Sequence, residues 1–277
     1  MSHLSAAKYW KVPNLDQIIG FADTNCKLVD FTVSSRAKYY SRKGCKIHLC
    51  TSEIPKGGVI NCSGNLVASP ELVFLQLASG MDLLNTILLG LQLCSSTPKN
   101  KRKSITTKRK LRNFMNKMSG QPGIKKANRA LKYIENGSAS IMESLVYMIL
   151  TLPNSLGGYG LDGIVFNYRV DLENEAVRRL NQRSCYVDIY YKAEKIAVEY
   201  DSFAFHNSPK EQGRDAVRSA ILHRHGIEVL HMNTIQLYDV KASDDFAKNL
   251  AIKLGKRINI RAEQYKKMRD QLRNLLP

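Results

Sequence analysis

The stretch of residues 186–206 constrains the fold of this chain more than any other part of its sequence. Two runs, 185–191 and 195–201, flank a short polar break at 192–194. Aromatic and β-branched side chains dominate both runs, and such side chains favour β-strands. The pattern therefore predicts a β-hairpin.

The register of this hairpin follows if Ala193 and Glu194 form a two-residue turn. Asp188 then lies opposite Glu199, with roughly 4.5–5.5 Å between the Cβ atoms of paired residues. Asp201 shares the face of Glu199, because strand side chains alternate with a period of two. Like charges about 5 Å apart repel by roughly 3 kcal/mol at an effective dielectric near 20. We therefore expect a cation, a shared proton or a basic partner here; a one-residue slip would instead leave scattered, solvated acids.

The acids of the hairpin belong to a longer motif. Its members in chain order are Asp188, the run Glu199-Tyr200-Asp201, His206, Asp215 and Arg218. In order and approximate spacing, residues 141–239 resemble the PD-(D/E)xK nuclease superfamily, in particular the branch related to very-short-patch-repair endonucleases. The resemblance implies an α/β (α+β) fold, with a restriction-endonuclease-like core in which helices flank a mixed central sheet. It also implies hydrolysis of DNA with Mg²⁺ or Mn²⁺ as cofactor.

Three positions depart from the pattern of that branch. Ser202 stands where the branch usually has Gly, and His206 comes one residue later than the pattern places it. Asp201 stands where other members of the superfamily have the catalytic Lys. The sequence therefore leaves the residue that handles the proton unidentified.

The resemblance assigns roles to individual residues. Asp188 and Glu199 are expected to hold the metal, and Glu143 on the preceding helix to be a third ligand or to position the water. His206 would orient the metal-bound water or protonate the leaving oxygen, and Arg218 would brace the phosphate or an acid of the site. The plainer alternatives are a solvated acid, a structural histidine and a surface arginine. The full expected catalytic set is Glu143, Asp188, Glu199, Asp201, His206 and Arg218.

The charge of the chain points to a polyanionic partner. Lys and Arg exceed Asp and Glu by 18, and no acid occurs between residues 98 and 132. Such a surface favours nucleic acid first, with strong and salt-sensitive binding, and an anionic membrane surface second. We predict a basic linker over 98–136, whose alternative is a merely solvated segment. Its expected DNA contacts are Lys101, Arg102, Lys103, Lys108, Arg109, Lys110 and Arg112.

Residues 1–97 predict a small α+β domain, followed after the linker by the nuclease-like domain 137–277. Short β-rich runs lead to Ser69, Pro70 and Glu71, a typical helix start. This order resembles the middle of abortive-infection type IV antitoxin-like proteins. The alternative function is therefore a DNA-binding, antitoxin-like regulator with an inactive nuclease core.

The remaining features predict a soluble protein of the cytoplasm. The apolar stretch 72–93 is interrupted by polar residues, so a buried helical pair is expected rather than a membrane span. The six cysteines form no Cys-x-x-Cys pair and are expected to be reduced thiols. We expect a Mg²⁺-dependent endodeoxyribonuclease acting in repair, in defence or as a toxin. A protein partner or a homodimer remains open.

Overall fold

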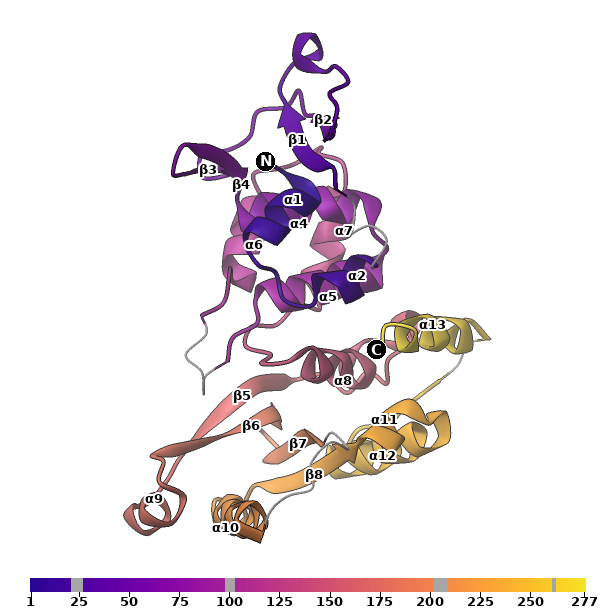
Figure 1. Ribbon diagram of the computed structural model, residues 1–277. Coiled ribbons are helices and arrows are strands. Elements are labelled where there is room, and N and C mark those ends of the chain that lie inside the picture. The colour runs from indigo at the N-terminus through magenta and orange to yellow at the C-terminus, as the bar shows by residue number, and fades with distance from the viewer. Residues whose placement is uncertain (21–26, 98–102, 202–208, 261–262) are drawn as a thin grey trace. The chain divides into compact units, whose positions relative to one another are not determined.

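The structure is a computed structural model that describes residues 1–20, 27–97, 103–201, 209–260 and 263–277. Its residues group into two compact units (Figure 1). The first comprises Met1–Asn136 together with Pro277, and the second comprises Gly137–Leu276. Each unit has its own buried interior and is described by itself.

The first unit begins with short helices and two small sheets. The strands β1 and β2 pair in parallel, and β3 and β4 form an antiparallel hairpin. Trp10, the one tryptophan of the chain, donates a hydrogen bond from Nε1 to the carbonyl of Ala68 (2.8 Å). The elements are α1 (His3–Tyr9), α2 (Leu15–Ile19), β1 (Val29–Val33), η1 (Arg36–Lys38), β2 (Cys45–Leu49), β3 (Val59–Cys62) and β4 (Asn65–Ala68).

A pair of apolar helices, α4 (Pro70–Gly80) and α5 (Leu83–Leu93), follows the hairpin. The Ser69 hydroxyl accepts a hydrogen bond from the Leu72 amide, and the Asp82 carboxylate accepts one from the Asn85 amide, so both helices have a side-chain N-cap. Phe74 and neighbouring leucines are fully buried. The predicted helical pair is therefore confirmed.

No helix in the described part of the chain combines the length and the apolar character needed to cross a membrane. The cysteines that the structure describes are free thiols, with Cys94 and Cys185 buried. Burial raises the pKa of Cys94 to about 12, and the nearby carboxylate of Glu71 adds to this rise. Its thiol is therefore protonated at neutral pH.

The basic stretch folds into the first unit, which corrects the prediction of a linker over 98–136. Its described part forms α6 (Lys108–Met115) and α7 (Ile124–Ala130), and both helices pack against α4. Leu111 and Met115 are buried on one side of α6. The prediction was based on the charges and overlooked the apolar residues of α6. Their helical spacing places them on one buried face of the helix and leaves the cations on the opposite face.

We expect Leu111→Ala to lower the free energy of unfolding of the first unit by about 2–5 kcal/mol, because the change empties a packed interior position. The measurement is urea unfolding of the full chain, followed by the fluorescence of Trp10, which reports on the first unit. The exposed neighbour Lys110→Ala is the control, with an expected change within about 0.5 kcal/mol. If Leu111→Ala leaves the free energy of unfolding unchanged, the alternative of a solvated linker is supported instead.

The second unit contains a four-stranded mixed sheet of order β5-β6-β7-β8. The strand β6 is antiparallel to both of its neighbours, β5 and β7, whereas β8 runs parallel to β7. The strands are β5 (Ile164–Asp171), β6 (Ser184–Tyr191), β7 (Ile196–Asp201) and β8 (Glu228–Asn233). The helices are α8 (Ile141–Thr151), α9 (Asn174–Leu180), α10 (Pro209–Arg224), α11 (Thr234–Tyr238), α12 (Val240–Lys253) and α13 (Glu263–Arg273), with the short turn η2 (Asn154–Leu156).

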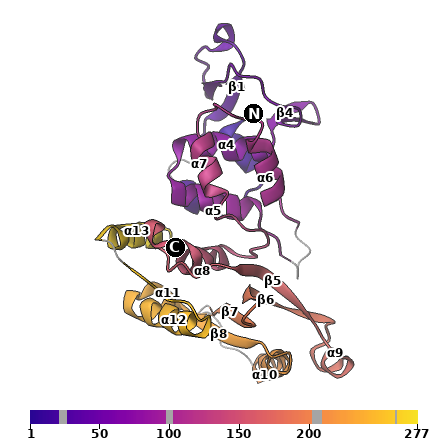
Figure 2. The ribbon, with the colours of Figure 1, turned by 180° about the vertical axis from the view of Figure 1, so that it is seen from behind.

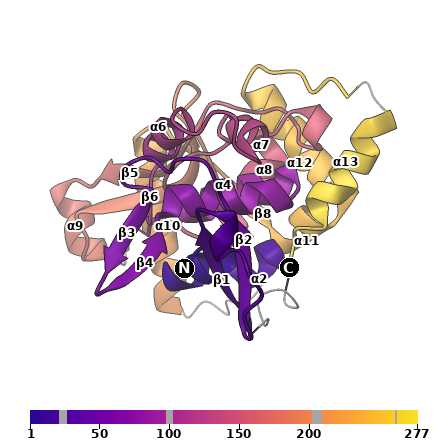
Figure 3. The ribbon, with the colours of Figure 1, turned by 90° about the horizontal axis from the view of Figure 1, so that it is seen from above.

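Helices cover both faces of this sheet. Figures 1 and 2 show α8 on one side and α9 with α10 on the other. Leu222 of α10 is buried in a cluster with Val187 and Ala197 of the sheet, while Tyr147 of α8 packs against Phe166 at 5.0 Å between ring centroids. The helix α13 packs against α8 and η2 (Figure 3). The chain therefore has the predicted α/β fold, with a mixed sheet between helices.

Candidate active site

The hairpin of β6 and β7 has the register that the sequence predicts. Its paired residues are Ile189 with Val198, Tyr190 with Ala197 and Tyr191 with Ile196. One further step in the same register sets Asp188 against Glu199. Near this step a side-chain oxygen accepts a backbone hydrogen bond: Asp188 Oδ2 accepts from the Tyr200 amide at 3.3 Å.

The neighbouring strand β5 is also distorted at this point. Asn167, which the register places opposite Asp188, has a left-handed backbone with φ of +48°. Its Nδ2 donates hydrogen bonds to the carbonyl of Gly137 (2.7 Å) and to Glu143 Oε2 (3.1 Å). Asp188 therefore lies at a local break in the sheet, and Asn167 connects this break to the start of α8.

Glu143 lies in the first turn of α8 and is buried, with 8% of its surface exposed. Its Oε1 accepts a hydrogen bond from the Ser140 hydroxyl (3.1 Å) and its Oε2 accepts one from the Ala139 amide (2.8 Å). The Ser140 hydroxyl in turn accepts from the Glu143 amide, an arrangement similar to a capping box. Glu143 is thus a buried capping residue, and the alternative of a solvated acid is wrong.

Glu199 is 7% exposed and is paired with Arg218 of α10. Both guanidinium Nη atoms donate to its carboxylate, with Nη1 at 2.6 Å from Oε2, and Nη2 also donates to the carbonyl of Tyr186 at 2.7 Å. Burial alone lowers the pKa of Arg218, but the hydrogen bonds and charge of Glu199 outweigh it and raise the pKa overall. Two roles were expected for Arg218, and the structure shows the second: Arg218 braces an acid of the site, Glu199.

Asp188 lies among these charges and has a strongly altered acidity. Burial, followed by the charges of Glu143 and Glu199, raises the pKa of Asp188 to about 7, although the Tyr200 amide and Arg218 oppose the rise. The carboxyl of Asp188 is therefore partly protonated at neutral pH. Of the three arrangements expected for such a cluster, the structure has a basic partner at Glu199, and the raised pKa of Asp188 favours a proton at that carboxyl.

Asp201 is exposed and pairs with a residue that the sequence prediction missed. Its Oδ2 lies 2.9 Å from Nδ1 of His231, whose side chain is half exposed. In the parallel pairing of β7 with β8, His231 is the partner of Glu199. The β-rich run 227–232 predicts a strand that extends the sheet beside the hairpin, as it does, but nothing local in it indicates its direction or its register on β7. His231 is therefore a further polar group beside the expected acids.

Some predicted residues fall elsewhere. His206, Lys101 and Arg102 lie outside the described residues. The basic set is otherwise in the first unit, where Lys108 Nζ is paired with Glu135 at 2.5 Å. Its exposed described members are Lys103, Arg109, Lys110 and Arg112.

The donor set determines how well the site suits a divalent cation. Within the ranges that the structure describes, no three His, Cys, Asp or Glu side chains are arranged to hold a metal ion. Both oxygens of Glu199 and both oxygens of Glu143 have hydrogen-bond partners, whereas Asp188 uses only Oδ2 for its hydrogen bond within the described residues. Carboxylate oxygens are the ligands that Mg²⁺ prefers. The chemistry fits, with Asp188 as the most available ligand, and the three-ligand set stays a prediction.

Comparisons with known proteins do not assign this site. No protein-family model, no curated protein and no solved structure matches the chain.

The raised pKa of Asp188 predicts a pH-dependent stability. The unfolded carboxyl loses its proton near its usual pKa of 3.8, while the folded one keeps it to about 7. The folded state therefore loses stability as pH rises between these values and loses no more above pH 7 from this group. We expect Asp188→Asn to become more stable than the wild type across this window, by on the order of 3 kcal/mol at about pH 8.

Differential scanning calorimetry of both proteins in EDTA at several pH values measures this difference. Trp10 fluorescence follows the first unit, which should not respond to the change. The exposed acid Asp245 provides a matched variant, Asp245→Asn, for which we expect no pH-dependent gain. A constant difference between Asp188→Asn and the wild type at all pH values would show that Asp188 titrates normally.

Proposed function

We propose that the chain is a metal-dependent endonuclease that hydrolyses phosphodiester bonds of DNA in the cytoplasm, with Mg²⁺ or Mn²⁺ as cofactor. The main support is the position of Asp188 at the break in the sheet, where burial and then the charges of Glu143 and Glu199 raise its pKa to about 7. Such perturbed carboxyls are common in catalytic sites. The order of the acids in the chain, which resembles the PD-(D/E)xK superfamily, adds to this support.

In this proposal Asp188 and Glu199 hold the cation, with Glu143 as a third ligand or as the residue that positions the water. A bound divalent ion would lower the pKa of water and neutralise charge on the phosphate. Arg218 fixes the carboxylate of Glu199 through its two hydrogen bonds. Because Arg218 also bonds to the carbonyl of Tyr186, it connects α10 to β6 and holds the acid in place.

His231 is the proposed proton-handling group in place of the missing lysine. An ionised carboxylate only accepts hydrogen bonds, so His231 Nδ1 donates to Asp201 and the neutral ring keeps Nε2 unprotonated. The Nε2 atom of a ring held in this way can accept a hydrogen bond from the attacking water and so act as a general base. Asp201 then acts as the residue that orients this imidazole.

DNA would be held by the cations of the first unit. Arg109, Lys110 and Arg112 are exposed on α6, whose other face is buried. Lys103 is exposed as well, shortly before the helix begins. Contacts from such side chains to phosphates bind without sequence preference and release counterions.

A second candidate function is a DNA-binding regulator whose nuclease core is inactive. Its specific support is the bidentate pairing of Arg218 with Glu199, which occupies both oxygens of an expected metal ligand. In that case the ion pair is a structural substitute for the cation. This regulator would bind DNA through α6 and would not cut it.

We expect the purified chain to nick or cut plasmid DNA with Mg²⁺ or Mn²⁺ and to be inactive in EDTA. Asp188→Asn and Glu199→Gln should reduce cleavage to background while DNA binding persists. His231→Ala should slow cleavage by about 10²–10⁴-fold, as expected for the loss of a general acid or base. Asp245→Asn is the control and should cut like the wild type. Equal cutting by all variants would indicate a contaminant, and binding without any cutting would favour the regulator.

We expect a triple variant, Arg109→Gln, Lys110→Gln and Arg112→Gln, to weaken DNA binding and its salt dependence. Each lost phosphate contact lowers the slope of log K against log salt by about 0.9, so the three together lower it by about 2.7. Fluorescence anisotropy with a labelled duplex over a range of salt concentrations measures this slope. A charge-matched control changes the exposed residues Lys11, Lys43 and Lys56 to Gln. Equal slopes for the two variants would mean that the cations of α6 contact DNA phosphates no more than other exposed lysines do.

A further inference from the structure

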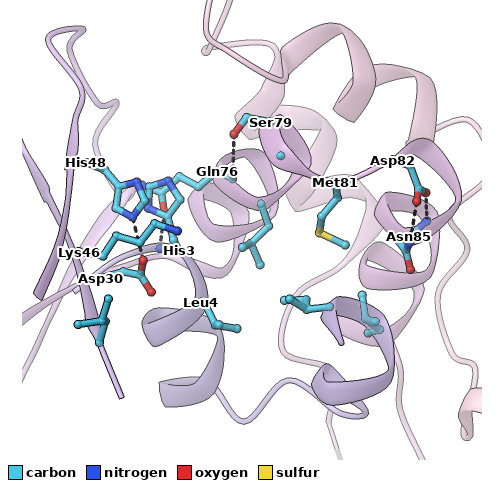
Figure 4. A pocket seen from close by; sticks show the side chains of 15 residues that line it. His3, Leu4, Asp30, Lys46, His48, Gln76, Ser79, Met81, Asp82 and Asn85 are labelled. Atoms are coloured by element: carbon cyan, nitrogen blue, oxygen red, sulfur yellow. Dashed lines mark hydrogen bonds and ion pairs between the residues drawn. The ribbon is translucent and has the colours of Figure 1, made fainter. Parts of the chain in front are cut away.

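The first unit contains a cleft of about 520 Å³ that the sequence prediction did not identify. Residues of α1, α2, β1, β2, α4 and α5 line it (Figure 4). Its volume lies within the range of about 300–1,000 Å³ that is common for small-molecule sites. The two ends of the cleft differ in chemistry, and this difference defines the kind of ligand that fits.

One end is built on a buried carboxylate that holds a histidine. Asp30 is 6% exposed, and its Oδ1 lies 2.8 Å from Nε2 of His48. Its Oδ2 accepts hydrogen bonds from the amide (3.2 Å) and the hydroxyl (3.0 Å) of Ser5. Since an ionised carboxylate only accepts, His48 donates through Nε2, and its ring orientation is fixed.

A second histidine stacks on the first. The rings of His3 and His48 lie 3.6 Å apart between centroids and are inclined by only 15° (Figure 4). His3 has a left-handed φ of +44°, an uncommon conformation for a residue with a side chain, and Gln76 Oε1 accepts its amide hydrogen. Burial, with the charges of His48 and Lys46, lowers the pKa of His3 to about 4. His3 is therefore neutral at pH 7, and Lys46 is the cation at this end.

The opposite end offers hydrogen-bond acceptors. Asp82 accepts from the amide (2.8 Å) and from Nδ2 (2.7 Å) of Asn85 at the start of α5. These bonds turn the Asn85 side chain so that its Nδ2 is used, whereas Oδ1 has no hydrogen-bond partner in the described ranges. This end therefore suits groups that donate hydrogen bonds, such as hydroxyl or amino groups.

Apolar side chains lie between the two ends. Figure 4 shows Met81 between the histidine pair and the Asp82–Asn85 pair. Leu28, which is exposed, and Leu77 line the same cleft. A flat apolar or aromatic body can pack here while its polar groups reach both ends.

We propose that this cleft binds a nucleoside monophosphate. The phosphate lies against Lys46 and the imidazole pair, the base packs over Leu77 and Met81, and sugar hydroxyl or base amino groups donate to Asp82 and Asn85. The hydrogen bonds of Asp30 would join β1, β2 and α1 in any case. A purely structural network, however, requires neither Lys46 at the rim nor a second, stacked ring in an uncommon backbone conformation.

Isothermal titration calorimetry of the full chain with AMP, GMP, CMP and UMP tests the proposal, with adenosine and inorganic phosphate as partial ligands. At least one nucleotide should bind, and both partial ligands should bind at least about 10-fold more weakly. Lys46→Gln should weaken nucleotide binding by about 10–100-fold, as expected when a hydrogen bond to a charged group is lost. Because Lys46 is exposed, this change leaves the fold intact. His3→Ala, which removes the stacked ring, should weaken binding as well.

Three controls separate this cleft from the other sites. Lys43→Gln removes a charge outside the cleft, the triple variant of α6 removes the DNA contacts, and Asp188→Asn removes the expected metal ligand. All three should bind the nucleotide like the wild type. The proposal fails if no nucleotide binds at about 1 mM. It also fails if Lys46→Gln binds unchanged, or if inorganic phosphate alone binds equally well.

Discussion

The charge balance of the second unit depends on how the guanidinium of Arg218 acts on two neighbouring carboxylates, the buried Glu199 and the half-buried Asp188. Arg218 neutralises Glu199 through two hydrogen bonds, whereas Asp188 accepts a single one, from the Tyr200 amide, in the part of the chain that the structure describes. Glu143 is stabilised separately by the N-terminus of its own helix. Among the described residues, Arg218 is the one cation that opposes the negative charges of Glu143 and Glu199 at Asp188, and burial together with this deficit of positive charge raises the pKa of Asp188 to about 7. The same deficit is what a divalent ion would relieve, so stability and the proposed chemistry have one origin.

The hairpin was predictable because its information is local. The polar break at 192–194 fixes the turn, the turn fixes the register, and the register sets Asp188 against Glu199. The position of His231 was not predictable in this way, since a parallel strand joins its neighbour through a crossover and not through a turn. The burial of Glu143 depends likewise on Asn167, whose left-handed backbone has no clear signature in the surrounding sequence.

The first unit shows where composition misleads. Thirteen basic residues without an acid between 98 and 132 predicted a linker, but a few apolar side chains on one face of α6 were sufficient to fold the described part against α4. Leu111 shows why, because it is fully buried beside cations that remain exposed. The cleft escaped prediction for a related reason. His3, Asp30 and His48 are far apart in the sequence, and the pairing of β1 with β2 and the packing of α1 on β1 bring them together.

The central claim is that a deficit of positive charge at Asp188 draws a divalent cation to this site. Anomalous scattering from crystals of the full chain grown with Mn²⁺ tests it most directly. The account predicts a peak about 2.0–2.6 Å from a carboxylate oxygen of Asp188, with Glu199 or Glu143 as a further ligand. A saturating concentration of Mn²⁺ that leaves Asp188 without a peak, while Arg218 stays paired with Glu199, would contradict it.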